Sequence, residues 1–384
     1  MNYGGFAVLL VVQWWITRAL TRLVDRRFPH WTRVAAKAAV YLFGLAAIGC
    51  YGFVFSDATA RLGLAGPLAT MLGAAALAYL VTATTVVVVY GVLRAIRKHL
   101  VANVDPARRH ALSAAGHLAM ASPFVAIGYG ALIQRTDFHV REIDVPVAGL
   151  PPDLDGFRVL QLSDIHLSPF LSESELARVI DASIELRPHL AVVTGDLIST
   201  RGDPLDACIR QLARIRTDAG VFGCMGNHER YAGAEDYAAQ AAAAVGIRFL
   251  RHQSHALKVG RAVLNLAGVD YQSLAGKQSY LRGAERLLVP GACNLLLSHN
   301  PDVFPVAVRQ GWNFMLAGHT HGGQVTVEIL DRSINPARFL TPYVYGLYQS
   351  GRSAAYVTRG IGTIGIPARI GAPPEISVLR LRKA

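Results

Sequence analysis

Four long apolar segments in the first third of the chain restrict the fold more than any other feature of the sequence. They are Tyr3–Leu20, Val34–Phe55, Leu64–Leu93 and Leu112–Ile133. Each approaches or exceeds the ~18–20 residues that a helix needs to cross the hydrocarbon core of a bilayer. Beyond about Arg135 no apolar run approaches this length, although the whole chain is 52% hydrophobic. We therefore predict a transmembrane region of about four helices over residues 1–135.

The first segment differs from a cleaved signal peptide at both of its ends. The opening "MNYGG" has no basic residue, and Trp14, Trp15 and Arg18 stand where a cleavage site needs small residues. We expect this segment to be retained as a membrane anchor.

The net charge of +12 is concentrated in the membrane region, which argues against a nucleic-acid partner. Residues 1–140 hold 13 Lys and Arg against four acids, and this accounts for nine of the twelve excess charges. The basic residues gather between segments one and two and between segments three and four, whereas the second connection has only Arg61. The positive-inside rule then predicts cytoplasmic basic loops in the cell (inner) membrane, with the rest of the chain on the outer or periplasmic face. Contacts between these loops and membrane lipids are compatible with that orientation.

After the fourth segment the sequence first becomes polar and then alternates between two kinds of apolar pattern. Residues 136–156 are polar and punctuated by Pro and Gly, which is typical of a linker. From residue 157 strand-like apolar runs alternate with helix-like ones, and this favours an α/β sheet covered by helices. We predict a separate domain over residues 157–384.

Polar side chains follow the predicted strands of this domain in five turns. They are Asp164 and His166, then Asp196, then Asn227 and His228, then His299, and finally His319 and His321 in "LAGHTHGGQ". Strand ends of an open α/β sheet converge at one edge, so side chains far apart in sequence can meet there. One such histidine is more often a hydrogen-bonded structural residue than a ligand, but five ordered turns argue for a common site.

The residue types in these turns suit metal-assisted phosphoryl chemistry. Asp, Asn and His ligands without thiolate fit divalent Mn, Fe or Zn. Two ions about 3.5–4 Å apart can activate a water and stabilise an in-line displacement. His228 is the candidate for a histidine outside the ligand set that protonates the leaving alkoxide.

The ordered blocks D-x-H, G-D, G-N-H-E, a later histidine and G-H-x-H resemble the signature of calcineurin-like metallophosphoesterases over about residues 157–381. The similarity is greatest to the subgroup of transmembrane proteins with a metallophosphoesterase domain. It implies a four-layer αββα sandwich and a metal-dependent hydrolase acting on phosphoric ester bonds. It also implies one metal on Asp164, His166 and His321, a second on Asn227, His299 and His319, a bridging catalytic Asp196, and His228 as the acid, oriented by Glu229.

Two features of the domain leave questions open. Ser199 stands where the family often has the second aspartate of G-D-x-x-D, so the tuning of the metal ligands is in doubt. The aromatic stretch "RFLTPYVYGLYQ" at residues 338–349 either packs on its own domain, which we expect, or faces lipid acyl chains.

Three classes of function remain open. The leading one is a membrane-anchored, dinuclear-metal-dependent phosphoesterase that cleaves phosphate ester or pyrophosphate bonds of a lipid-linked or exported substrate. The second is a UDP-2,3-diacylglucosamine-type pyrophosphate hydrolase, or a nucleotide or protein phosphatase of the same fold. The third is a non-enzymatic metal-binding membrane regulator. The near absence of charge inside the apolar segments argues against the third class.

Overall fold

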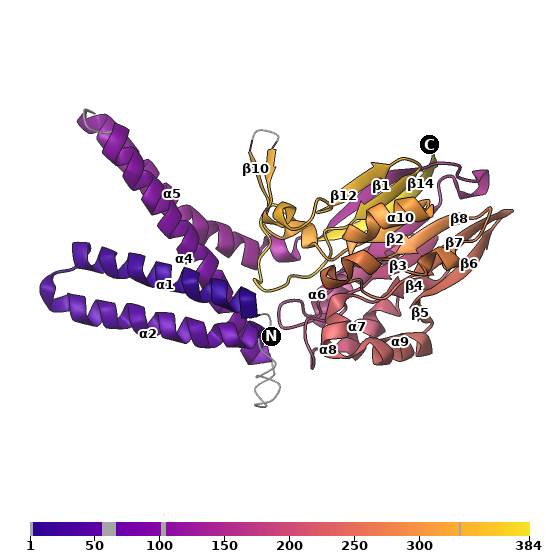
Figure 1. Ribbon diagram of the computed structural model, residues 1–384, viewed down its shortest axis with the longest axis horizontal. Coiled ribbons are helices and arrows are strands. Elements are labelled where there is room, and N and C mark those ends of the chain that lie inside the picture. The colour runs from indigo at the N-terminus through magenta and orange to yellow at the C-terminus, as the bar shows by residue number, and fades with distance from the viewer. Residues whose placement is uncertain (1–2, 56–66, 101–104, 330–331) are drawn as a thin grey trace. The chain divides into compact units, whose positions relative to one another are not determined.

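The computed structural model describes residues 3–55, 67–100, 105–329 and 332–384 (Figure 1). They divide into two compact units. The helical unit contains residues up to 131 with residues 365–368, and the sheet unit contains residues 132–364 and 369–384. Each unit has hydrophobic clusters of its own.

The helical unit is built from α1 (Tyr3–Arg27), α2 (His30–Phe55), α4 (Pro67–Leu100) and α5 (Pro106–Leu132). Among the described residues these four helices are long and apolar enough to cross a membrane, which agrees with the prediction. The expected start of the third segment at Leu64, and Arg61 before it, lie outside the described residues.

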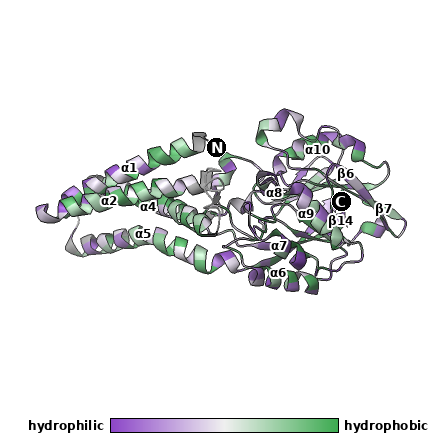
Figure 2. Cartoon of the chain, turned by 90° about the horizontal axis from the view of Figure 1, so that it is seen from below, coloured by the Kyte–Doolittle hydropathy of each residue, from purple (hydrophilic) through white to green (hydrophobic). Residues whose placement is uncertain are grey.

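Helices α1, α2 and α4 share a small apolar core. Ile16, Ala47 and Tyr51 are buried together with Ala76 and Leu80. The Tyr51 hydroxyl donates a hydrogen bond of 2.8 Å to Oε1 of Gln13, so the buried polar groups of this core are paired. Hydrophobic residues make up much of these helices (Figure 2), and many of them are exposed, among them Val11, Leu42 and Leu68, as expected for helices that face lipid.

The sheet unit contains two six-stranded sheets. The order in the first sheet is β1 (His139–Val147), β14 (Glu375–Lys383), β2 (Arg158–Leu162), β3 (Leu190–Thr194), β4 (Val221–Cys224) and β5 (Ile247–Phe249). The order in the second is β12 (Gly346–Ser350), β13 (Ser353–Val357), β9 (Phe314–Ala317), β8 (Cys293–Leu297), β7 (Ala262–Gly268) and β6 (Gln253–Val259). A separate hairpin is formed by β10 (Val327–Ile329) and β11 (Arg332–Ile334).

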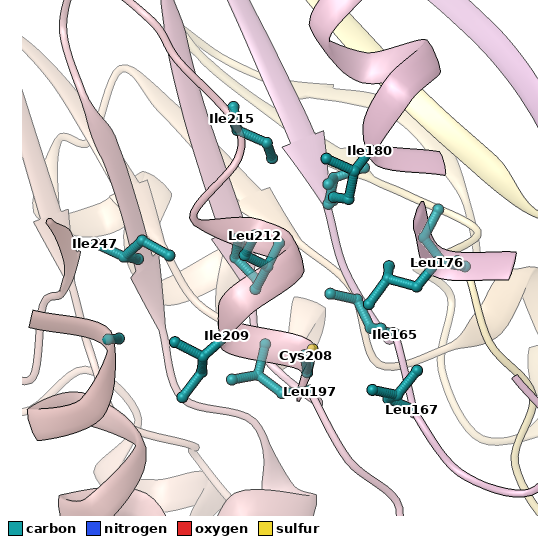
Figure 3. Packing of buried hydrophobic residues seen from close by; sticks show 14 of the residues in the cluster. Ile165, Leu167, Leu176, Ile180, Leu197, Cys208, Ile209, Leu212, Ile215 and Ile247 are labelled. Carbon is teal, nitrogen blue, oxygen red and sulfur yellow. The ribbon is translucent and has the colours of Figure 1, made fainter. Parts of the chain in front are cut away.

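Buried clusters show how the layers of the sheet unit pack. One cluster joins the two sheets face to face, with side chains such as Leu190, Leu295 and Leu379. The outer face of the first sheet packs against α6 (Glu173–Glu185), α7 (Leu205–Leu212) and α9 (Glu235–Ala244) (Figure 3). The outer face of the second packs against α10 (Phe304–Gln310). This is the expected αββα sandwich.

Helix α6 shows how the sequence produces one of these covering elements. Ser172 caps its first turn by accepting the N–H of Glu175, and the Glu175 carboxylate accepts the N–H of Ser172 in return. Leu176, Val179 and Ile180 then recur at helical spacing and are buried against the sheet.

The passage expected as a linker is instead partly a strand. β1 pairs with β14 in parallel, from His139 opposite Glu375 to Val147 opposite Lys383. Val145 and Val147 point into the core between the sheets, and Pro146 is tolerated because β1 is an edge strand. The strand that pairs with β1 lies at the other end of the sequence. The local Pro and Gly residues therefore suggested a linker, and nothing nearby in the sequence indicated the pairing.

Candidate metal centre

The predicted site residues all follow strands and meet in one region of the sheet unit. Asp164 and His166 follow β2, Asp196 follows β3, and Asn227 opens α8 (Asn227–Ala232) just after β4. His299 follows β8, and His319 and His321 follow β9. Main-chain hydrogen bonds join the turns: the N–H of His166 donates to Asp196 (3.0 Å), and the N–H of Gly318 donates to His299 (3.2 Å).

The backbone of these turns is strained. Nine non-glycine residues in the described part of the chain have positive φ, and five of them are predicted site residues. They are Asp164, His166, Asp196, His319 and His321, with φ between 49° and 74°. Such conformations cost free energy for residues with a Cβ atom and persist where surrounding contacts impose them, as at functional sites.

A first group of ligand atoms is formed by Asp164, His166 and His321. Nε2 of His166 lies 3.2 Å from Nε2 of His321, and Nε2 of His321 lies 3.4 Å from Oδ1 of Asp164. All three side chains are buried, and their ligand atoms lie within 4.8 Å of one another. Imidazole nitrogens and a carboxylate oxygen facing a common point are the arrangement that a divalent cation requires.

A second group is formed by Asp196, His299 and His319, and Asn227 adjoins it. Oδ2 of Asp196 lies 3.0 Å from Nε2 of His299, which lies 3.1 Å from Oδ1 of Asn227. The same Oδ2 atom is 3.5 Å from Nε2 of His166 in the first group. Asp196 therefore lies between the groups, and all seven predicted ligands are brought together.

The outer nitrogens of three histidines are held by neighbouring groups. Nδ1 of His299 donates to the carbonyl of Thr194 at 2.6 Å, and Nδ1 of His321 lies 3.4 Å from the carbonyl of Gly362. Nδ1 of His166 is 3.2 Å from Oγ of Ser199. These contacts leave Nε2 of each ring for the centre. Ser199 thus supports His166 with a neutral hydroxyl.

Burial and the charges of neighbouring groups shift the pKa values of the side chains in the centre. Burial raises the pKa of Asp164 and lowers that of His319 to about 3. Burial would also raise the pKa of Asp196 and lower that of His299, but their attraction outweighs it. The pKa of Asp196 is held well below its usual value, and the pKa of His299 rises to about 10. Without metal, His299 is therefore protonated and paired with the Asp196 carboxylate, and a bound cation would displace that proton, because a metal ligand needs the neutral imidazole.

Glu229 does not orient His228, contrary to the expectation. Its buried carboxylate accepts the main-chain N–H groups of Asp196 (2.9 Å), Leu197 (2.7 Å) and Gly226 (2.9 Å). Glu229 therefore fastens the turn that carries Asp196 to the turn that carries Asn227. Two of its partners, Asp196 and Leu197, follow a different strand, and the spacing of G-N-H-E alone does not reveal them.

His228 forms a further group of potential ligand atoms with His166 and Asp196, and its ring is held by the main chain. Its Nδ1 donates to the carbonyl of Ser199 at 2.5 Å, and its N–H donates to Oδ1 of Asp196 at 2.9 Å. Burial lowers the pKa of His228 to about 4. Since Nδ1 is engaged, Nε2 is the nitrogen that can exchange a proton.

Two glycines allow the turns to approach the carboxylates closely. A Cβ atom on Gly226 would collide with Oδ1 of Asp196, and one on Gly318 would collide with Oγ of Ser163 and Oδ2 of Asp164. Any larger residue at either position would push a carboxylate out of place.

Sequence reasoning missed two residues that border the centre. The buried guanidinium of Arg369 braces the turn of His321 by donating to five carbonyls, those of Arg359, Gly360, Gly362, Ala372 and His321. The ring of Tyr271 lies 5.5 Å from that of His319. Tyr271 follows β7 just as the ligands follow their strands, so the same rule would have found it, whereas the partners of Arg369 are set only by the folded loop.

Three other histidines lie outside the ligand groups. Nδ1 of His189 accepts the N–H of Arg158 at 3.0 Å, and Nδ1 of His255 contacts Arg248 at 2.9 Å. His252 is exposed.

Comparisons with known proteins find relatives of this chain. The family model described as calcineurin-like phosphoesterase matches residues 157–333. Over 259 residues the chain is 30% identical to the uncharacterized metallophosphoesterase YkuE of Bacillus subtilis, covering 66% of this chain and 89% of that one. Over 228 residues it is 31% identical to the phosphodiesterase YaeI of Escherichia coli, covering 59% of this chain and 82% of that one.

A relative from Danio rerio also contains membrane segments by its name, "Transmembrane protein with metallophosphoesterase domain". It is 31% identical over 281 residues, which cover 70% of this chain. The chain spans 62% of the length of that relative. A solved structure of an archaeal phosphodiesterase is similar with a TM-score of 0.31 and 10% identity, covering 54% of this chain and 87% of that one.

Proposed function

Because this chain belongs to the calcineurin-like phosphoesterase family, whose members are metal-dependent hydrolases of phosphoester bonds, we propose that it is a membrane-anchored phosphoesterase with two divalent metal ions. The observation that carries the proposal is the position of Asp196. Its carboxylate is grouped with His166 and His228 on one side and with His299 and His319 on the other, and these two groups of potential ligands share no other residue. A bridging carboxylate of this kind is what a pair of ions requires.

The described residues fit this pair of ions. Asp164, His166 and His321 would hold one ion and Asn227, His299 and His319 the other, with Asp196 between them. When bound, the ions supply an activated water and neutralise charge on the phosphoryl oxygens. Their identity is Mn, Fe or Zn by the ligand types.

His228 would deliver the proton to the leaving group. Its Nδ1 keeps its proton in the hydrogen bond to the carbonyl of Ser199, so Nε2 carries the exchangeable proton. Burial keeps the free ring neutral, but a bound anionic phosphate favours the imidazolium and raises its pKa. The substrate would therefore charge His228 when a proton is needed on the leaving oxygen.

A phosphodiester is the first substrate class to test. Purified full-length protein with added Mn²⁺ should hydrolyse bis(4-nitrophenyl) phosphate, and a chelator should abolish this activity. 4-Nitrophenyl phosphate, phospholipids and lipid-linked pyrophosphates then separate monoesterase, lipid phosphoesterase and pyrophosphate hydrolase. A chain that binds metal but hydrolyses none of these with Mn²⁺, Fe²⁺ or Zn²⁺ would support the regulator class.

The side of the membrane on which the sheet unit lies limits the substrates that it can reach. The basic connections support cytoplasmic loops and a sheet unit on the outer face of the cell membrane, where the substrate would be an exported or lipid-borne phosphoester. A nucleotide-linked lipid made in the cytoplasm is the alternative.

We predict that a reporter active only outside the cytoplasm gives signal when fused after Ala384. A cytoplasmic reporter at the same junction serves as the control. Signal from the cytoplasmic reporter alone would reverse the orientation and favour the nucleotide-linked lipid.

A further inference from the structure

The segment after the β10–β11 hairpin exposes two adjacent apolar side chains, Phe339 and Leu340, which we call the tip. We call residues 336–343 the apolar loop, and it begins with the short helix η7 (Pro336–Phe339). Phe339 is 91% exposed and Leu340 is 81% exposed, more than any other large hydrophobic residue described in the sheet unit. Two adjacent side chains of this size in water are unfavourable, so a partner surface is indicated.

The base of the apolar loop is fixed to the turn that carries His319 and His321. Nδ2 of Asn335 donates to the carbonyl of Gly322 at 2.8 Å, just before the loop. The Thr320 hydroxyl donates to the carbonyl of Val344, just after it. The exposed tip is therefore held at a set position relative to the metal centre.

The rest of the aromatic stretch packs on the sheet unit. The ring of Tyr343 lies 5.7 Å from Phe304 and 5.1 Å from Tyr348, and the Thr341 hydroxyl donates to Asp302. Each of the two alternatives for this stretch, packing on its own domain and facing lipid, thus fits different residues. The tyrosines pack on their own domain, and Phe339 and Leu340 do not.

A lipid surface is the partner that fits this tip. The chain has four helices of membrane-spanning length, and only a short segment separates the end of α5 at Leu132 from the start of β1 at His139. A bilayer surface is therefore always close to the sheet unit. Arg338, exposed beside Phe339, adds the positive charge that anionic headgroups attract.

We propose that Phe339 and Leu340 insert among lipid chains at the membrane surface and hold the metal centre beside headgroup phosphates. The insertion itself needs only the exposed tip and the membrane. The consequence for substrate choice rests on the proposed phosphoesterase function, since it makes a phosphoester within the lipid layer the preferred substrate.

Insertion can be measured without any assay of activity. Two full-length variants are compared, both with Cys50→Ala; one also carries Phe339→Cys and the other Val245→Cys. Each is labelled with a fluorescent maleimide and placed in phosphatidylcholine–phosphatidylglycerol nanodiscs. The other cysteines, Cys208, Cys224 and Cys293, are buried. Val245 is the matched control, because it is an exposed apolar residue at the end of α9.

Doxyl-labelled phosphatidylcholine should quench most of the fluorescence from position 339 and little from position 245. Absence of quenching at position 339, or equal quenching at both positions, would overturn the insertion.

A second arm tests the consequence for substrate choice. In the double variant Phe339→Ser with Leu340→Ser, hydrolysis of phosphatidylglycerol in vesicles should fall about tenfold or more, because the anchoring apolar surface is lost. Hydrolysis of bis(4-nitrophenyl) phosphate in solution should be unchanged, because neither side chain packs in the core. Equal loss on both substrates would overturn the role of the tip in substrate choice. If the unchanged chain hydrolyses neither substrate, the proposed function fails while the quenching result still decides insertion.

Discussion

Replacing Asp196 with alanine is expected to remove both metal ions and to reduce turnover by roughly 10³-fold or more. Its carboxylate lies 3.0 Å from His299 and 3.5 Å from His166, in the two ligand groups. Without it, two divalent ions would face each other with no negative charge between them. Metal content by mass spectrometry and hydrolysis of bis(4-nitrophenyl) phosphate measure the two effects.

The control for this variant is Asp181→Ala. Asp181 is a surface residue of α6 that pairs with Arg214, so its loss should leave metal content and turnover unchanged. Both variants should keep the circular dichroism spectrum of the parent. Two ions retained by Asp196→Ala would exclude the bridging role.

Replacing His228 with alanine is expected to retain the metal ions and to lose about 10²–10⁴-fold in turnover on esters with poor leaving groups. The ring lies outside the two proposed ligand sets, and its Nε2 is the nitrogen free to give up a proton. An alkoxide leaving group needs that proton, whereas nitrophenolate leaves without it. The ratio of turnover on alkyl and nitrophenyl esters, for variant and parent, measures the effect.

His252→Asn is the matched control, because this exposed histidine lies outside the centre and asparagine tolerates its positive φ of 51°. It should leave both rates unchanged. A loss in His228→Ala that is equal for the two classes of ester would reject the role of proton donor, and loss of metal would make His228 a ligand.

The order of the polar turns indicated, before the fold was known, which polar side chains would lie close together. Each proposed ligand directly follows an apolar strand, from Asp164 after β2 to His321 after β9. Within each sheet the carboxyl ends of parallel strands lie along one edge, so the sequence indicates which side chains share that edge. The packing of the two sheets then brings the turns after β2, β3 and β4 together with those after β8 and β9. The transmembrane helices were equally predictable, because the length of an apolar run is a local property.

Contacts between distant segments could not be predicted in the same way. β1 was read as a linker because its pairing with β14 joins positions more than two hundred residues apart. Glu229 was given the wrong partner because its carboxylate accepts main-chain N–H groups around Asp196. The types of residue in a segment do not show which strand it pairs with, or which main-chain N–H groups a carboxylate accepts.

The sequence by itself determined the membrane helices, the alternation of strands and helices, and the set of side chains that could bind metal. The tertiary structure alone decided how those side chains are supported, with Ser199 beside His166 and Arg369 bracing the turn of His321. It also separated Phe339 and Leu340, which are exposed, from the tyrosines packed beside them. The physical reason is that hydrophobic periodicity and strand ends are encoded locally, whereas burial and hydrogen-bond partners depend on which segments the folded chain brings together.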